Sequence, residues 1–588
     1  MDNKPSLSQY FGDTETPPVS QFFDEIGTSP SDMIQSVYLG DGEDIKTTGS
    51  ALFAQNMTVS FTHSATQEMQ FTNVIPTVSS ATAVPATSLP DPSTFFDTIG
   101  PEPQIGSGKS NLVNPSVITD ALDGLSLKNQ PVDKEADRRR DAWIPNDEAK
   151  KTLIKAQSSP KGSFFPEREV LTMPGLVLEE ELPDALQEVA VKHLGVSSAG
   201  ARAVVRAEHV SRDEAGLREL LRTGCLRAAV NLTTVLLTNV TQGAGRMHRP
   251  SKHTPRSLQL WLTRFAVLLR ISAECKEEYE RVMHLFNSRL NDPLVKEAEP
   301  FGDFSKPDMF YQFYPDTYEN RTGSLVPFAL RLLIAELPGH VGKPEQSLDR
   351  LYAMLDIIQT MLSNLKEGKT EDGTGIITSE QDKTESLRLW SGREVRVLHS
   401  IVNCAIVLKD YRLATKILQN LEQTSDSVAL KRALSSAQCR VALLGGRERA
   451  AAGCCAAGRQ LRLHLCPTPD VREYVDLGLI DIARGKYQDA YNNFARAADQ
   501  EPTNIMVANN LSVCLLYMGR LKEAIAILQK AINSDPERGL NESLLINLCT
   551  LYELESSKTN EKKRNLLTML CKYKSDTIPN VLECLKLS

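Results

Sequence analysis

Two consecutive stretches of this sequence repeat one pattern at a constant offset of 34 residues, between Val471 and Pro536. Small residues recur where two antiparallel helices would approach closely, and glycines recur where a helix would end. Prolines recur where the second helix would stop. One helix pair cannot bury its own apolar face, so the spacing predicts a stack of pairs. The matched positions are Leu477 and Leu511, Gly478 and Ser512, Gly485 and Gly519, Tyr487 and Leu521, Ala490 and Ala524, Phe494 and Leu528, Ala497 and Ala531, and Pro502 and Pro536.

This pattern resembles the tetratricopeptide repeat (TPR). We expect one repeat over residues 471–504, a second over 505–538, and a decayed repeat with a capping helix over 539–588. The predicted fold class is all-α, a TPR-like α-solenoid of antiparallel helix pairs preceded by a long disordered N-terminal tail.

The middle of the chain, residues 201–440, is predicted to be an array of helix pairs that has lost the repeat consensus. A polar, glycine-bearing insertion at 366–383 is expected to be a mobile loop. Residues 441–470 are rich in Ala, Arg and Cys, and we expect an irregular segment there, either a divergent loop or an altered reading frame. The expected helices are Leu217–Leu221, Leu226–Leu237, Leu258–Ile271, Glu274–Phe286 after a break at Ser272–Ala273, Pro327–Leu337, Gln346–Leu365, Val395–Leu408 and Tyr411–Leu421.

The N-terminal tail, residues 1–135, is rich in Ser, Thr, Pro and acidic residues, with 15 Asp and Glu against 4 Lys in positions 1–130. Such a composition cannot bury enough apolar surface to offset the entropy of ordering. Within the tail, Phe22-Phe23-Asp24 recurs as Phe95-Phe96-Asp97. The repetition favours docking motifs that order on binding, and the core resembles FFAT-type peptides, while chance recurrence stays open.

Residues 136–200 are predicted to be a basic and apolar entry segment. Its Arg138–Arg140 run precedes Trp143, either as a solvated charge run or as a contact to an acidic partner. A second aromatic cluster contains Phe310, Tyr311, Phe313 and Tyr314. It predicts either a buried plug between repeats or an exposed anchor for a partner.

Composition and motifs exclude several classes of protein. The net charge of −8 argues against nucleic acid as a partner. No apolar run is long enough to span a membrane, and the N-terminus has no apolar signal core, so we expect a cytosolic or nuclear chain. No metal is expected, since His248 and His253 lack a third ligand and no Cys-x-x-Cys pair occurs. No cofactor is expected either, because Gly106–Ser110 lacks the first glycine of a phosphate-binding loop, and no catalytic motif is present. The chain is therefore predicted not to be an enzyme.

Several segments outside the repeat consensus occur in one order and resemble the subunit 12 family of the trafficking protein particle (TRAPP) complex. They are Arg138–Pro145 (RRRDAWIP), Leu171–Leu176 (LTMPGL), Ser257–Trp261 (SLQLW), Lys306–Phe328, Gln346–Leu351 (QSLDRL) and Tyr552–Ser557 (YELESS). The resemblance covers about residues 135–588.

That resemblance implies a non-catalytic scaffold or tether subunit of the TRAPP III complex. The family acts in transport between the endoplasmic reticulum and the Golgi, in Golgi organisation and in autophagy, with a mitotic role at the kinetochore. The implied partners are other TRAPP III subunits and a kinetochore protein, with indirect membrane association at the Golgi periphery or intermediate compartment. The alternative is a generic TPR adaptor or cochaperone that binds peptide motifs.

Overall fold

The computed structural model describes residues 134–160, 163–178, 180–196, 202, 204–274, 293–302, 304–319, 321–464, 467–556, 559–576 and 585–587. The two Phe-Phe-Asp motifs and the predicted helix Glu274–Phe286 lie outside these ranges, apart from Glu274. Within them every regular element is helical, and the only β-contacts are isolated bridges such as Leu176 to Ala244. The predicted all-α class is confirmed.

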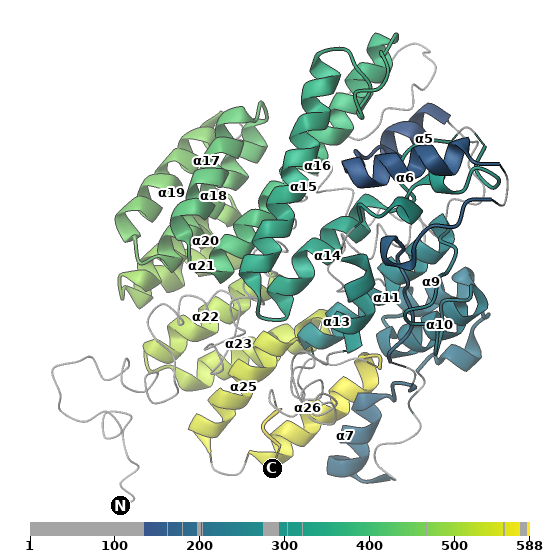
Figure 1. Cartoon of the computed structure of the whole chain (residues 1–588). Coiled ribbons are helices and arrows are strands. Elements are labelled where there is room, and N and C mark those ends of the chain that lie inside the picture. The colour runs from purple at the N-terminus through teal and green to yellow at the C-terminus, as the bar shows by residue number, and fades with distance from the viewer. Residues whose placement is uncertain are drawn as a thin grey trace, which may run out of the picture.

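Antiparallel helices follow one another from the middle of the chain to its C-terminal end (Figure 1). The array begins with α9 (Glu214–Arg222), α10 (Leu226–Asn239), α11 (Pro255–Glu274), α13 (Pro293–Ala298), α14 (Phe328–His340), α15 (Pro344–Lys366) and α16 (Glu380–Val407). It continues with α17 (Tyr411–Thr424), α18 (Val428–Leu444), α19 (Glu448–Leu463), α20 (Val471–Ala483), α21 (Tyr487–Gln500), α22 (Ile505–Tyr517), α23 (Leu521–Ser534), α24 (Pro536–Gly539), α25 (Glu542–Glu555) and α26 (Asn560–Tyr573).

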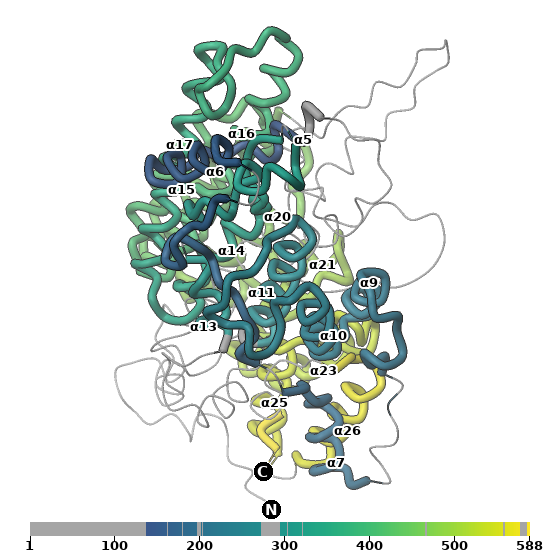
Figure 2. Tube along the Cα trace, turned by 45° about the vertical axis from the view of Figure 1, so that its right-hand side comes forward, coloured from purple at the N-terminus to yellow at the C-terminus, as the bar shows by residue number. Residues whose placement is uncertain are grey.

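Shorter elements precede the array or lie between its helices. They are α5 (Lys134–Asp141), α6 (Asp147–Ser158), η3 (Arg168–Val170), α7 (Ala185–Leu194), η4 (Ala207–His209), η6 (Glu299–Phe301), η7 (Pro307–Met309) and η8 (Tyr311–Phe313). Helices α5 and α6 lie beside α15 and α16 in both views (Figures 1 and 2).

The segment predicted to be irregular at 441–470 contains the end of α18 and the whole of α19, so that prediction is wrong. Helix α19 packs along α18, with Ala451, Cys455 and Arg462 buried on one face. The small side chains of Ala451 and Cys455 are sufficient because they let the two helix backbones approach closely, and alanine favours the helix. The turn is made by Gly446 at φ +66°, as it is by Gly485 at +70° in the next pair.

Three other boundaries also differ from the predictions. Helix α11 continues through Ser272 and Ala273 to Glu274, so the predicted break there is wrong. Helix α16 begins at Glu380, well before the predicted Val395. The predicted mobile loop at 366–383 includes a turn bridged between Lys369 and Ile376, and its Glu371 is 1% exposed. The start of α16 and the turn before it were hidden by their polar sequence, because ion pairs with Arg138 and Arg139 bury part of this region.

The ends of the helical array meet. Helix α7, from the entry segment, lies beside α26, the last long helix (Figures 1 and 2). Leu186 of α7 is fully buried in the same apolar cluster as Leu567 and Leu570 of α26. An entry helix therefore covers the apolar face that the last repeat would otherwise expose to water.

Candidate interaction surfaces

The titratable side chains of the described ranges are the first candidates for a functional site. No cluster of three or more His, Cys, Asp or Glu side chains suitable for a metal ion occurs there. Burial raises the pKa of the Cys455 and Cys514 thiols to about 12, so both are protonated near neutral pH and unreactive as nucleophiles. None of the described helices combines the length and apolar character that spanning a membrane would require.

The basic run of the entry segment pairs with acidic residues of the same chain. Arg138 reaches Glu371 at 2.6 Å, and Arg139 reaches Asp382 at 3.0 Å and Glu385 at 2.6 Å. Arg138 and Arg139 therefore match neither sequence interpretation, a solvated run or a contact to another protein. Their ion pairs within the chain form an intramolecular clasp. The clasp joins α5 to the start of α16.

Trp143 lies in the core, 6% exposed, and the structure corrects its assignment as a partner contact. The guanidinium of Arg331 stacks over its ring at 4.0 Å, and the ring centroid of Trp390 is 6.3 Å away. A buried aromatic ring with a stacked cation fixes the entry segment on α14 and α16.

The aromatic cluster around η8 is a buried plug, as one of the two interpretations predicted. Phe310 is 0% and Tyr311 2% exposed, so these two side chains are not available to a partner. The Tyr311 hydroxyl donates to Asp141 at 3.1 Å. Phe313 and Tyr314 are half-buried, and the Tyr314 hydroxyl accepts from the backbone N–H of His253 at 3.2 Å.

An apolar rim, made of Phe164, Phe165 and Ile154, borders this plug and was not predicted from the sequence. Phe164 packs edge-on against Phe313, with centroids 6.0 Å apart. The next residue, Phe165, is 86% exposed, and Ile154 of α6 is 64% exposed. Isolated exposed apolar residues are common, so the rim is a candidate contact only together with the half-buried Phe313 and Tyr314.

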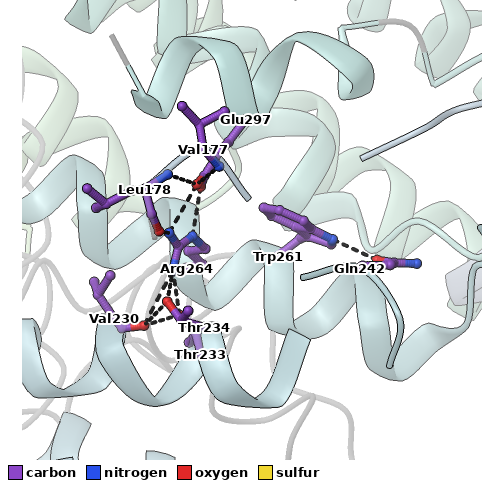
Figure 3. A network of polar contacts seen from close by, with 9 residues as sticks. All are labelled: Val177, Leu178, Val230, Thr233, Thr234, Gln242, Trp261, Arg264 and Glu297. Atoms are coloured by element: carbon purple, nitrogen blue, oxygen red, sulfur yellow. Dashed lines mark hydrogen bonds and ion pairs between the residues drawn. The ribbon is translucent and has the colours of Figure 1, made fainter. Parts of the chain in front are cut away.

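A fully buried ion pair anchors the first part of the array (Figure 3). Arg264 on α11 donates to both carboxylate oxygens of Glu297 on α13, at 2.7 and 3.0 Å, and both side chains are 0% exposed. The Glu297 carboxylate also accepts from the backbone N–H groups of Val177 and Leu178, at 2.9 and 3.0 Å. A signal for this site was visible in the sequence, because Arg264 is the one charged residue within the apolar stretch Leu258–Leu269.

The repeat residues chosen from the sequence take the positions that close packing requires. A Cβ at Gly478 would approach the Phe494 ring to 2.6 Å, so only glycine fits there. Leu477 and Ala531 are half-buried, Tyr487 stacks on Tyr517 with centroids 4.3 Å apart, and Gly519 turns the chain at φ +75°. Pro502 is exposed beyond α21, and Pro536 opens α24. The side chains buried in this core include Ala490, Phe494, Ala497, Leu511, Ala524 and Leu528.

Polar contacts fasten the entry segment to the C-terminal end. Arg202 pairs with Asp184 at 2.6 Å and donates to the carbonyls of Lys574 and Ser575, at 2.5 and 2.6 Å. The Ser575 hydroxyl donates to the carbonyl of Gly224 at 2.6 Å. The contacts made by Lys574 and Ser575 span more than 350 residues of sequence, and no short-range pattern could have predicted them.

One hollow of about 280 Å³ lies between α23, α25 and α26. Tyr552 and Lys562 line it, and the hydroxyl of Tyr552 accepts from Gln529 at 2.8 Å. Its lining combines the polar side chains of Gln529, Asn533, Tyr552, Lys562 and Asn565 with four apolar ones.

Comparisons with known proteins agree with this architecture. The tetratricopeptide repeat family model matches residues 481–541. Trafficking protein particle complex subunit 12 of Mus musculus is 34% identical over 460 residues, which is 77% of this chain and 54% of the mouse protein. The Homo sapiens protein of the same name is 33% identical over 455 residues, 77% of this chain and 59% of the human protein. The chain thus spans a little over half the length of these relatives.

Proposed function

The chain is a relative of trafficking protein particle complex subunit 12, and from this we propose that it is a non-catalytic subunit of a trafficking protein particle. The observation that carries the proposal is the similarity to both relatives over 77% of the chain, which extends far beyond the repeat match at 481–541. The repeat consensus alone would relate the chain to many proteins. Similarity over 77% of the chain relates it to one kind of subunit.

The fold supports a scaffold role. Stacked helix pairs offer extended surfaces to other proteins. In this chain, the C-terminal end is fastened to the start of the array, since Arg202 donates to the carbonyl of Lys574 and Asp576 accepts from the backbone N–H of Ala228 in α10. Such a closed array holds its outer surfaces in fixed positions, which a tether that joins several subunits requires.

The finer assignments are part of the same proposal. They comprise membership of TRAPP III, action in transport between the endoplasmic reticulum and the Golgi, Golgi organisation and autophagy, and a mitotic role at the kinetochore. The proposed location is the cytoplasm at the Golgi periphery, with membrane association through the complex. The proposed partners are the other subunits of the particle.

The alternative, a cochaperone that clamps acidic C-terminal peptides, is weaker. Such a clamp needs Lys and Asn on the first helix of its first repeat. Val475 and Leu479 occupy those positions here, 1% and 2% exposed.

Size fractionation of cell extract, followed by capture of the tagged full-length chain, tests the proposal. We expect the chain in a large particle together with other TRAPP subunits identified by mass spectrometry. The variant Asp499→Ala changes an exposed residue of α21, and it should enter the particle in the same way as the unaltered chain. A chain that elutes only as a monomer and captures no TRAPP subunit would overturn the proposal.

A further inference from the structure

A loop between α10 and α11 carries exposed cations and has no acidic residue near it in sequence. Arg246, Arg249 and Lys252 are exposed, and no Asp or Glu occurs from Leu220 to Ala273. Within the described residues, neither Arg246 nor Arg249 forms an ion pair. Their guanidinium groups are therefore open to an anionic partner. We call residues 244–252 the basic loop.

The basic loop is fixed on the entry segment. The backbone N–H of His248 donates to the carbonyl of Met173 at 3.2 Å. A Cβ at Gly175 would lie 2.1 Å from the backbone nitrogen of Met247, so the two segments are in direct contact. A surface that is already in place loses little conformational entropy when a partner binds.

Aromatic contacts connect the basic loop to the apolar rim. The ammonium of Lys252 lies 5.8 Å from the ring centroid of Tyr314. Tyr314 packs edge-on against Phe313 with centroids 5.0 Å apart, and Phe313 packs edge-on against Phe164 at 6.0 Å. The residue that follows, Phe165, protrudes into solvent. The cations and the apolar rim therefore belong to one continuous surface.

The apolar rim is accessible, in contrast to the plug behind it. Phe165 is 86% and Ile154 64% exposed. Lys151, one helical turn before Ile154, and Lys155 are exposed too, and neither lysine forms an ion pair with a described residue. Acidic side chains are also exposed around the rim, and they are Asp147, Glu148, Glu167, Glu169, Asp316 and Glu319. The basic loop is the part of this surface that carries cations without acids.

The N-terminal segment of the chain has the complementary composition. Positions 1–130 hold 15 acidic and 4 basic residues. Phe22-Phe23-Asp24 and Phe95-Phe96-Asp97 each place two aromatic rings next to a carboxylate. Aromatic rings favour packing on other exposed rings, and carboxylates favour guanidinium groups. The rim and the basic loop offer both kinds of partner.

The N-terminal segment also joins the fold close to this surface. The described structure begins at Lys134, the first residue of α5, and the last residue of α5, Asp141, accepts from the hydroxyl of Tyr311 at 3.1 Å. Tyr311 lies two residues before Phe313, on which the rim packs. About 36 residues separate Asp97 from Lys134, and an extended chain covers up to roughly 3.3–3.6 Å per residue, so the motif can reach the rim. Such a tether raises the effective concentration of the motif at the surface.

We propose that the N-terminal segment docks on the basic loop and the apolar rim of its own chain through a Phe-Phe-Asp motif. The phenylalanine rings pack on Phe164 and Phe165. The aspartate of the motif and the acids that flank it pair with Arg246 and Arg249. The docked motif shields these groups until an acidic aromatic sequence of another protein displaces it. The contact lies within one chain and does not depend on the proposed complex.

A competition experiment on the full-length chain tests this contact. The probe is a fluorescein-labelled synthetic peptide of residues 91–104, and its binding is measured by fluorescence anisotropy. The protein is either unaltered or carries alanine at Phe22, Phe23, Asp24, Phe95, Phe96 and Asp97, all outside the described fold. We expect the altered chain to bind the peptide at least about tenfold more tightly, because its tethered competitor is gone.

Charge variants of the altered chain locate the acidic half of the contact. The double variant Arg246→Gln, Arg249→Gln should weaken peptide binding about tenfold or more, since both charge-assisted pairs are lost. The double variant Arg412→Gln, Lys416→Gln removes the same net charge from the exposed side of α17 and should leave binding unchanged. A peptide with Asp97→Asn should bind more weakly to the altered chain, which tests the pairing without changing the fold.

An apolar variant locates the aromatic half. Phe165→Ser in the altered chain should weaken peptide binding several-fold, because a packing partner of the phenylalanine rings is lost. Ile376→Ser is the matched control, since Ile376 is 80% exposed in the turn before α16 and lies outside the proposed surface. Both side chains are exposed, so neither change should unfold the chain.

Equal peptide binding by the unaltered and altered chains would overturn the proposed contact, as would no binding to either. Binding that withstands the loss of Arg246 and Arg249 would place the motif elsewhere and would also overturn it. Vesicles with about 30 mol% phosphatidylserine are a second probe, and binding to them without binding to the peptide would assign the surface to an anionic membrane instead. Loss of the large particle in extract is a separate result that concerns only the proposed function.

Discussion

The carboxylate of Asp576 accepts a hydrogen bond from the backbone N–H of Ala228, with 2.8 Å between Oδ2 and N, across 348 residues of sequence. Ala228 lies in the first turn of α10, where helix N–H groups lack intrahelical partners. The N-cap residue of α10, Cys225, makes no side-chain cap hydrogen bond. The C-terminal end of the chain therefore caps a helix near the start of the array.

Replacing Asp576 should open this junction. The variant Asp576→Ala leaves a buried N–H without its acceptor and removes a negative charge from a helix N-terminus, which costs about 1–2 kcal/mol. Hydrogen exchange should become faster at residues 226–228 and in α7 and α26. The exposed Asp499→Ala serves as the control, and unchanged protection at Ala228 would contradict the capping role.

Breaking the buried ion pair should destabilise the first part of the array more strongly. Arg264→Met leaves Glu297 charged and buried, which costs about 3–5 kcal/mol. The double variant Arg264→Met, Glu297→Met should recover much of that loss in a thermal unfolding measurement, because no buried charge remains. Arg256→Met removes an arginine that is 53% exposed, and it should change stability by less than about 1 kcal/mol.

Two buried neighbours should give opposite pH dependences of stability. Burial raises the pKa of Asp308 to about 7 and lowers the pKa of His253 to about 4. As pH rises from about 4 to 6.5, the unfolded chain loses its Asp308 proton while the folded chain keeps it, so this group lowers stability. Between these pH values His253 is neutral in the folded chain and takes up a proton on unfolding. As pH rises, the unfolded chain loses that proton, so this group raises stability over the same range.

Single variants separate the pH dependence of stability due to Asp308 from that due to His253. In Asp308→Asn the histidine acts alone, and the denaturant midpoint should rise between pH 4 and 6.5. In His253→Gln the carboxyl acts alone, and the midpoint should fall between pH 4 and 7. The unaltered chain should show a flatter profile than either variant, and parallel slopes in all three would refute the assignment.

Two glycines within helices should respond to alanine with opposite signs. Gly478→Ala places a Cβ 2.6 Å from the Phe494 ring and should destabilise the chain by about 1–3 kcal/mol. Gly453 of α19 is exposed, with no atom within 4 Å of a Cβ built there, so Gly453→Ala should stabilise it by about 0.5–1 kcal/mol. Thermal unfolding measures both, and destabilisation by Gly453→Ala would argue against a regular α19.

Local periodicity predicted most of the helices because it depends on neighbouring residues. The repeat over α20–α23, the helix pairs α9–α10 and α16–α17, and the turn glycines all follow from spacings of three, four and 34 residues. Prediction failed at α19, where alanine and cysteine replace the large apolar residues of the pattern. Their small volume still allows helix packing, but it gives a weak periodic signal.

By itself, the sequence determined the helical class, the repeat unit and the resemblance to a TRAPP subunit, since these lie in residue order and spacing. Only the tertiary structure decided which predicted contact residues are accessible. Trp143 and Phe310 are as aromatic as any partner anchor, yet the fold buries both. Likewise, the bond from Ala228 to Asp576 depends on where the whole array brings its two ends. Burial and long-range pairing are properties of the packed chain, because they require atoms that are distant in sequence to meet.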